Sequence, residues 1–208
     1  MSIPSLIDYQ LPVSGEYPLS KVKWKINVNS AALLIHDMQE YFLDYYDRDS
    51  QLIRQVIQNI SELKQWCKQN NIPVFYTAQP AIQADDDRQL LNDMWGPGIT
   101  AHPERKQIVA QLTPEDNDKV LDKWRYSAFF RSNLKQQLAE QHRNQLIICG
   151  VYAHIGVLQT AADAFMNGIQ PFVVSDAVAD FSRDDHLYAL RYVQRNLGMA
   201  SELTQIIQ

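Results

Sequence analysis

The sequence contains little of what several classes of protein require. Only two of its 208 residues are cysteine, Cys67 and Cys149, which is too few for a disulfide framework or a cysteine-rich zinc site. The 19 basic and 24 acidic side chains leave a net charge of −5, so no overall positive field attracts nucleic acid or an anionic membrane. Apolar runs such as Ala31–Ile35 are far shorter than the roughly 18 residues of a spanning helix, and Met1–Leu11 does not resemble a signal peptide. These absences predict a cytoplasmic protein with neither a membrane nor a nucleic-acid partner.

What is present is the composition of a globular protein, with 46% apolar and 21% charged residues. A chain of this length is expected to form a single domain over residues 1–208. Residues 1–28 contain prolines and no regular pattern, and we expect them to form an arm laid over the core. The stretch Asp85–Pro103 combines the run Asp85-Asp86-Asp87 with the Gly/Pro-rich turn Trp95–Gly98, which predicts a lid or an irregular insertion.

Short apolar runs alternate with segments of helical periodicity along the chain. Predicted strands cover Ala31–His36, Pro73–Thr77, Lys119–Lys123, Gln145–Gly150 and Ile169–Ser175. Predicted helices cover residues 51–69, Leu134–Leu138, Val157–Asn167 and Asp184–Asn196, the last beginning near Ser182 or Arg183. Such β-α repetition predicts an α/β fold with three α/β/α layers and a mostly parallel, Rossmann-like central sheet.

Polar residues follow each predicted strand at its carboxyl end, where open α/β sheets bind their ligands. They are Asp37, Thr77, Gln79, Lys123, Tyr152, His154, Asp176 and Asp180. Five separate segments thus deliver polar groups to one edge, which predicts a functional site there.

Individual members of this set have two interpretations each. Asp37 either caps a loop or is an acid or base whose pKa is tuned by burial, and Lys123 is either solvated or a cation beside Asp37 that receives an anionic substrate. His36 should point to the other face of its strand and make a structural hydrogen bond, whereas His154 either orients its turn or contacts a ligand. His102, His142 and His186 lack converging partners and are expected on the surface. Asp180 is expected to cap a helix or a turn.

Six segments resemble one known family. They are Leu33–Phe42 (LLIHDMQEYF), Tyr76–Pro80 (YTAQP), Asn92–Gly98 (NDMWGPG), Lys123–Phe129 (KWRYSAF), Asn144–Gly156 (NQLIICGVYAHIG) and Ala177–Ser182 (AVADFS). Together they resemble the isochorismatase-like hydrolase superfamily, and within it the isochorismatase branch, over essentially the whole chain.

The chain departs from the amidase branch of that superfamily at one position. Where that branch has its nucleophilic cysteine, the aligned pattern Gly150–Thr160 has Gly156, which cannot form a thioester. Cys149 lies inside an apolar strand and Cys67 on a helix, so neither thiol replaces it. The metal ligands of the zinc-binding amidases are also missing after the second strand, so we expect neither a metal nor a cofactor.

The resemblance implies hydrolysis of the vinyl ether of isochorismate by general-acid catalysis without a covalent intermediate. It implies Asp37, Lys123 and Gly156 as catalytic residues, with Gly156 making room for the ligand. The implied substrate contacts are Gln79, Arg88, Tyr152, Phe42, Trp95 and His154.

Two other functions remain open at this point. One is a phenazine-pathway hydrolase acting on 2-amino-2-deoxyisochorismate, and the other is a scaffold that docks on a siderophore synthetase. The resemblance implies a homodimer and siderophore synthetase or carrier partners. We expect no aryl carrier domain within this chain, because nothing after Gly198 resembles its phosphopantetheinylated serine.

Overall fold

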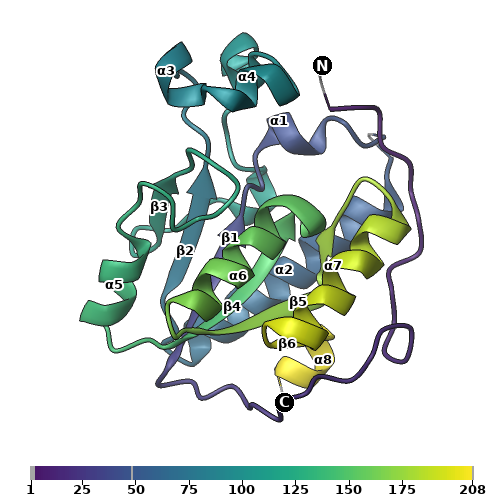
Figure 1. The fold of residues 1–208 in the computed structure, drawn as a ribbon, viewed down its shortest axis with the longest axis vertical. Helices are drawn as coiled ribbons and strands as arrows, with labels where there is room; N and C mark the ends of the chain where they lie inside the picture. Colours follow the sequence, from purple (N-terminus) through teal and green to yellow (C-terminus); the bar gives the residue numbers. More distant parts are fainter. Residues whose placement is uncertain (1–2, 48, 208) are drawn as a thin grey trace.

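The computed structural model describes residues 3–47 and 49–207. Its centre is one six-stranded sheet of order β3-β2-β1-β4-β5-β6, in which every neighbouring pair is parallel (Figure 1). The strands are β1 (Ala31–His36), β2 (Val74–Ala78), β3 (Lys119–Asp122), β4 (Gln145–Val151), β5 (Gln170–Ala179) and β6 (Met199–Ser201). Strand order therefore reverses between β1 and β4, which is the point where such sheets bind ligands. The predicted three-layer, Rossmann-like fold is confirmed.

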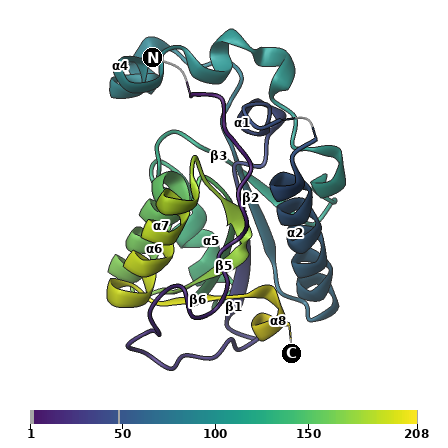
Figure 2. The ribbon, with the colours of Figure 1, turned by 90° about the vertical axis from the view of Figure 1, so that its right-hand side faces the viewer.

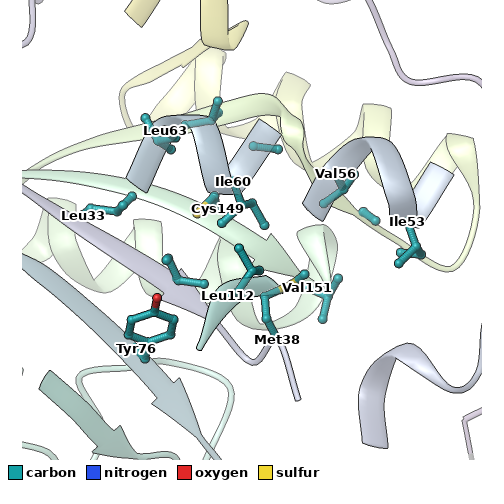
Figure 3. Packing of buried hydrophobic residues seen from close by; sticks show 14 of the residues in the cluster. Leu33, Met38, Ile53, Val56, Ile60, Leu63, Tyr76, Leu112, Cys149 and Val151 are labelled. Carbon is teal, nitrogen blue, oxygen red and sulfur yellow. The ribbon is translucent and has the colours of Figure 1, made fainter. Parts of the chain in front are cut away.

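Helices cover both faces of the sheet (Figure 2). One face carries α2 (Gln51–Gln69) and α8 (Leu203–Ile206), and the other carries α5 (Leu134–Glu140), α6 (Leu158–Met166) and α7 (Arg183–Asn196). Leu33 of β1 packs with Ile60 and Leu63 of α2 (Figure 3). Ile35 belongs to the same cluster, whereas Leu34 belongs to the cluster on the side of α6, as the alternation of a strand requires. Because both faces are covered, every residue of β1 is buried.

Local signals account for the long elements. Helix α2 begins where Ser50 Oγ accepts a hydrogen bond from the Ile53 amide at 3.0 Å, and α7 begins at Ser182, whose Oγ accepts from the Asp185 amide at 3.1 Å. Both serines are N-caps, the position where serine stabilises a helix by ~1 kcal/mol. The predicted bounds of β1 and α2 are confirmed without a shift.

Two irregular segments lie outside the sheet and its flanking helices. The arm, residues 3–28, runs along the side of the molecule and buries Ile3, Leu6 and Tyr17 (Figure 2). The segment 80–112 forms a layer above the sheet edge (Figure 1), and we call it the roof. It contains α3 (Asp85–Arg88), α4 (Leu90–Trp95) and three short 3₁₀ turns, Gly98–Ala101, Pro103–Arg105 and Ala110–Leu112.

The structure differs from the sequence predictions in several places. Strand β5 continues to Ala179, so Asp176 lies within it and accepts a hydrogen bond from the Leu203 amide instead of joining the site. His186 is not on the surface: it is fully buried between the Tyr9 hydroxyl and the Ser175 carbonyl. The short elements α1 (Glu40–Leu43), β6 and α8 were not predicted, nor was the π-helical turn Ala153–Val157 before α6.

Among the helices that the structure describes, none combines the length and apolar character needed to cross a bilayer.

Candidate active site

A cavity opens at the carboxyl edge of the sheet, next to the reversal in strand order between β1 and β4. Asp37 follows β1, Lys123 follows β3, and Tyr152 follows β4. The cavity is lined by Ile3, Asp37, Tyr41, Phe42, Gln79, Arg88, Leu91, Trp95, Gly98, Lys123, Arg125, Tyr126, Val151, Tyr152, Ile155, Gly156 and Phe181. Segments that are remote in sequence thus meet where parallel strands end.

We call Asp37, Lys123 and Thr77 the floor, because Asp37 and Lys123 line the cavity and Thr77 is hydrogen-bonded to Asp37. Lys123 Nζ donates to Asp37 Oδ2 at 2.9 Å, and Thr77 Oγ1 donates to Asp37 Oδ1 at 2.5 Å. Asp37 is 5% exposed and Lys123 3%, so this ion pair is almost completely removed from water. Its charges are therefore partnered, as buried charges must be.

The floor sets the protonation of Asp37. Burial raises the pKa of the Asp37 carboxyl, but the Lys123 ammonium, together with His36 and the Thr77 hydroxyl, holds that pKa below its ordinary value. Without substrate, Asp37 is accordingly a carboxylate. Its backbone adopts a φ of 50°, a conformation that aspartate tolerates better than most residues and that is frequent at functional sites.

Gln39 is a site residue that sequence reasoning missed. Its buried amide accepts from the Gln79 amide at 2.7 Å and donates to the Gln79 carbonyl at 3.0 Å. It also donates to the Lys106 carbonyl at 2.8 Å. Gln39 thereby fixes the backbone of Gln79 and ties the roof to β1. The one available signal was its position two residues after Asp37, within the same motif.

Arg88 reaches the cavity from the roof. Its Nε donates to Asn92 Oδ1 at 3.0 Å and its Nη2 to the Gly96 carbonyl at 2.7 Å. Its Nη1 is buried and has no hydrogen-bond partner among the described residues. Gly98 allows this placement, because a Cβ there would stand 2.5 Å from Arg88 Nη2. A buried guanidinium with an unused donor is a receptor for an anion.

Aromatic side chains form the wall between floor and roof. The rings of Tyr152 and Phe181 lie 4.7 Å apart, and Trp95 packs edge-on against Phe181 at 6.0 Å. The Tyr152 hydroxyl donates to the Phe42 carbonyl at 2.5 Å, so its ring rather than its hydroxyl faces the cavity. Phe181 belongs to the quoted segment Ala177–Ser182 but was not singled out, because its neighbours in space are remote in sequence.

Among the substrate contacts that the resemblance implies, His154 does not line the cavity. Its Nδ1 lies 2.5 Å from Asp180 Oδ1, and its backbone amide donates to Asp180 Oδ2 at 2.6 Å. Burial alone would lower the pKa of His154, but the buried Asp180 carboxylate raises it above the ordinary value. The structure thus favours orientation of the turn over ligand contact for His154, and Asp180 caps that turn.

Gly156 lines the cavity, and the expectation that it makes room for the ligand stays a prediction. A Cβ at residue 156 would stand 2.2 Å from His36 Cε1. The glycine therefore accommodates the imidazole of His36, and a side chain at this position has no space.

Neither thiol is placed for nucleophilic chemistry. Cys149 and Cys67 are fully buried, and burial raises the pKa of Cys67 to about 12. Cys149 Sγ lies 3.6 Å from the Leu34 carbonyl, inside the sheet. Among the described residues there is also no group of three or more His, Cys, Asp or Glu side chains that could hold a metal ion.

Fold and site together define a doubly wound α/β protein with a buried acid–base pair at its switch point. Residues 31–205 match the family described as Isochorismatase domain. The chain belongs to the isochorismatase family.

Curated relatives support this assignment at high identity. The chain is 58% identical over 198 residues to enterobactin synthase component B of Escherichia coli (strain K12), covering 95% of this chain and 70% of that protein. It is 50% identical over 192 residues to isochorismatase of Bacillus subtilis (strain 168), covering 92% and 62%. Phenazine biosynthesis protein PhzD of Pseudomonas fluorescens is 45% identical over 205 residues, covering 99% and 98%.

Solved structures share the fold at low identity. A cysteine hydrolase from Pseudomonas syringae pv. phaseolicola 1448A superposes with a TM-score of 0.80 at 20% identity, covering 91% of this chain and 95% of that one. This similarity supports the architecture alone.

Proposed function

We propose that this chain hydrolyses the vinyl ether of isochorismate to 2,3-dihydro-2,3-dihydroxybenzoate and pyruvate in catecholate-siderophore biosynthesis. The observation that carries the proposal is a buried carboxyl–ammonium pair, Asp37 and Lys123, facing an arginine with a free donor across an aromatic cavity. The family and the identities to enterobactin synthase component B and to isochorismatase support the same reaction.

The reaction requires an acid more than a nucleophile. Protonation of the terminal methylene of the enolpyruvyl group gives an oxocarbenium ion, and water then adds to the cationic carbon and releases a proton. The resulting hemiketal collapses, with its carbon–oxygen bond to the ring breaking, and the ring oxygen takes up a proton to give the dihydrodiol acid beside pyruvate. Asp37 is the group placed to donate the first proton, because its carboxyl lines the cavity.

The substrate itself supplies the conditions for protonating Asp37. In the free protein Lys123 holds the pKa of Asp37 low. A bound dianion adds negative charge next to Asp37 and competes for the Lys123 ammonium, and both effects raise the pKa of the carboxyl. Asp37 therefore takes up its proton when substrate binds.

The site offers two cations, Arg88 and Lys123, for the two carboxylates of isochorismate. Arg88 Nη1 is a free donor on the roof, and Lys123 is a cation on the floor that a substrate carboxylate can share with Asp37. Gln79 lines the same cavity with its backbone fixed by Gln39, while Phe42, Trp95 and Tyr152 exclude water from the ring and the oxocarbenium ion. Gly156 supports the chemistry from below by admitting His36.

We also propose a cytoplasmic homodimer that hands its product to a siderophore synthetase or carrier partner. Apolar side chains are exposed on the outer helices, namely Phe165 and Met166 on α6 and Tyr188 and Tyr192 on α7, which suits contact with another protein surface. Sedimentation of the full chain tests the dimer, and a purely monomeric protein at micromolar concentration would contradict it.

The test of the function is release of pyruvate, measured with coupled lactate dehydrogenase, on isochorismate and on 2-amino-2-deoxyisochorismate in parallel. We expect a higher kcat/KM on isochorismate, because identity to PhzD is lower than to the other two relatives. Preference for the amino substrate would move the chain to the phenazine pathway. If the protein releases pyruvate from neither substrate, the enzymatic function is excluded and the scaffold function is left.

A further inference from the structure

His36 is a buried histidine that the proposed chemistry does not use. It is the last residue of β1, directly before Asp37, and is fully buried. Its Nδ1 lies 2.9 Å from the Val151 carbonyl and 3.5 Å from Asp37 Oδ2, and its Nε2 lies 3.3 Å from Thr160 Oγ1. The imidazole thus touches the acid on one side and the β4–α6 joint on the other.

The hydrogen-bond partners fix the tautomer of His36. The Val151 carbonyl can only accept, so Nδ1 carries the proton, and Nε2 is left to accept from the Thr160 hydroxyl. Thr160 Oγ1 in turn accepts from the Ala128 amide at 2.9 Å. Burial, reinforced by the charge of Lys123, lowers the pKa of His36 to about 4, so the imidazole is neutral at physiological pH.

Gly156 completes the arrangement. The Cβ of a residue at 156 would stand 2.2 Å from His36 Cε1 and 2.9 Å from Nε2, distances that no real side chain accepts. The imidazole is fully buried and has a partner at each ring nitrogen, so moving it aside would break these contacts. Residues 36 and 156 therefore share one volume, which only one side chain can occupy.

We propose that His36 is a positioning residue for the hydrolysis. By donating to the Val151 carbonyl it holds the turn that places Tyr152 and Gly156 in the cavity, and by filling the space beside Gly156 it keeps position 156 free of any side chain. The pair thus excludes a nucleophile at position 156 and leaves Asp37 as the reacting group. This inference rests on the proposed reaction.

Two substitutions distinguish the hydrogen bond that His36 donates to the Val151 carbonyl from the volume that its ring occupies. His36→Asn places an amide nitrogen near the position of Nδ1, so it retains the donor to Val151 but removes the outer half of the ring. His36→Leu fills much of the volume but lacks a donor. Because misplacing reacting groups by ~1 Å can cost ~100-fold in rate, we expect kcat to fall at least about tenfold in His36→Leu. We expect kcat in His36→Asn to recover most of this loss, with KM changed by less than kcat in both.

A double substitution tests the shared volume. Gly156→Ala in the wild-type background should lose about 100-fold in kcat/KM or fail to fold, and Gly156→Ala combined with His36→Asn should regain at least about tenfold or restore folded protein. The same four proteins, compared by thermal unfolding, should show a coupling between the two positions.

The outcomes are distinct. Equal kcat in His36→Leu, His36→Asn and the wild type, or a Gly156→Ala variant that His36→Asn does not improve, would overturn the inference. Absence of pyruvate release by the wild type would instead overturn the proposed reaction, and the thermal cycle would still decide whether residues 36 and 156 share one volume.

Discussion

The floor and the roof of the cavity are built in opposite ways. On the floor, both oxygens of Asp37 accept hydrogen bonds, one from Thr77 and one from Lys123. On the roof, Arg88 has a buried nitrogen with no partner among the described residues. The charges of the floor are thus paired within the protein, whereas the roof keeps a donor that a ligand can use. On the proposed function, the chemistry belongs to the floor and recognition to the roof.

The two regions also differ in how they are held. Asp37 and Lys123 directly follow strands of the sheet, and Thr77 lies within β2, so the packing of the sheet fixes all three. The roof is held at its inner end by the bond from Gln39 to the Lys106 carbonyl and by the buried side chains of Ile99 and Leu112. Its outer part is held by polar contacts to the segment after β3, where Arg125 donates to the Asp87 carbonyl and to Gln89 Oε1. This outer part exposes Ile82 and Leu90 by 86% and 75%, and we expect it to open before the floor.

The largest effect should follow from Asp37→Asn on the floor. The substitution keeps the size of the side chain and removes the proton donor, which should lower kcat by about 10²–10⁴-fold with a smaller change in KM. Steady-state pyruvate release measures both constants. Asp93→Asn, an exposed change on the roof, is the matched control. A kcat for Asp37→Asn within threefold of the wild type would remove Asp37 as the acid.

His36, which lies directly before Asp37 of the floor, should make stability depend on pH. His36 has a pKa of about 4 in the folded protein against 6.5 for an unperturbed histidine, so between these values only the unfolded chain binds the proton. The free energy of unfolding should therefore fall by roughly 3 kcal/mol from this group as pH drops from 6.5 to 4. His186, also with a pKa of about 4, should add a similar loss.

Denaturant unfolding at pH 7 and pH 4.5 measures this effect. His36→Asn should reduce the difference between the two pH values. An equal pH dependence in His36→Asn and the wild type would contradict the assignment of this loss to His36.

On the roof, Arg88→Gln should act mainly on binding. Losing a charged hydrogen bond to a substrate carboxylate costs about 1.5–3 kcal/mol, which is a rise in KM of roughly 10–100-fold. Arg105→Gln removes an exposed arginine from the same segment and should change KM little, since surface ion pairs contribute about 0–1 kcal/mol. If Arg88→Gln lowered kcat and left KM unchanged, the separation of roles between roof and floor would fail.

The smallest effect expected is a displacement between two pH profiles. The acid works in its protonated form, which exists below its pKa, so activity is lost as pH rises. The falling limb of the pH profile of kcat/KM reports the pKa of Asp37 in the free protein, which Lys123 lowers. The falling limb of the kcat profile reports the pKa of Asp37 in the substrate complex. We expect the kcat limb at least about one pH unit higher, equivalent to ~1.4 kcal/mol. Coincident limbs would show that substrate does not protonate Asp37.

Prediction from sequence succeeded where local patterns decide the structure. The continuous apolar run of β1 and the long amphipathic α2 with its serine cap needed no tertiary information. The same patterns placed Asp37 and Lys123 at one edge, since parallel strands end together.

What sequence could not supply were contacts between remote segments. His186 is buried because Tyr9 of the arm and Ser175 of β5 both bond its ring, and neither is near it in the chain. Asp176 left the predicted site because β5 continues past it and α8 offers the Leu203 amide. The Gly156–His36 contact depends on the distance between β1 and the turn after β4, which no periodicity encodes.

The buried thiols have a practical consequence for measuring motion of the roof. Cys67 and Cys149 are inaccessible to solvent, and burial raises the pKa of each, so both are inert toward alkylating dyes. A cysteine introduced at Ile82, 86% exposed on the roof, would react selectively with a fluorophore while the native sequence stays otherwise intact. The native thiols therefore do not compete for the dye, and fluorescence from residue 82 would report motion of the roof alone.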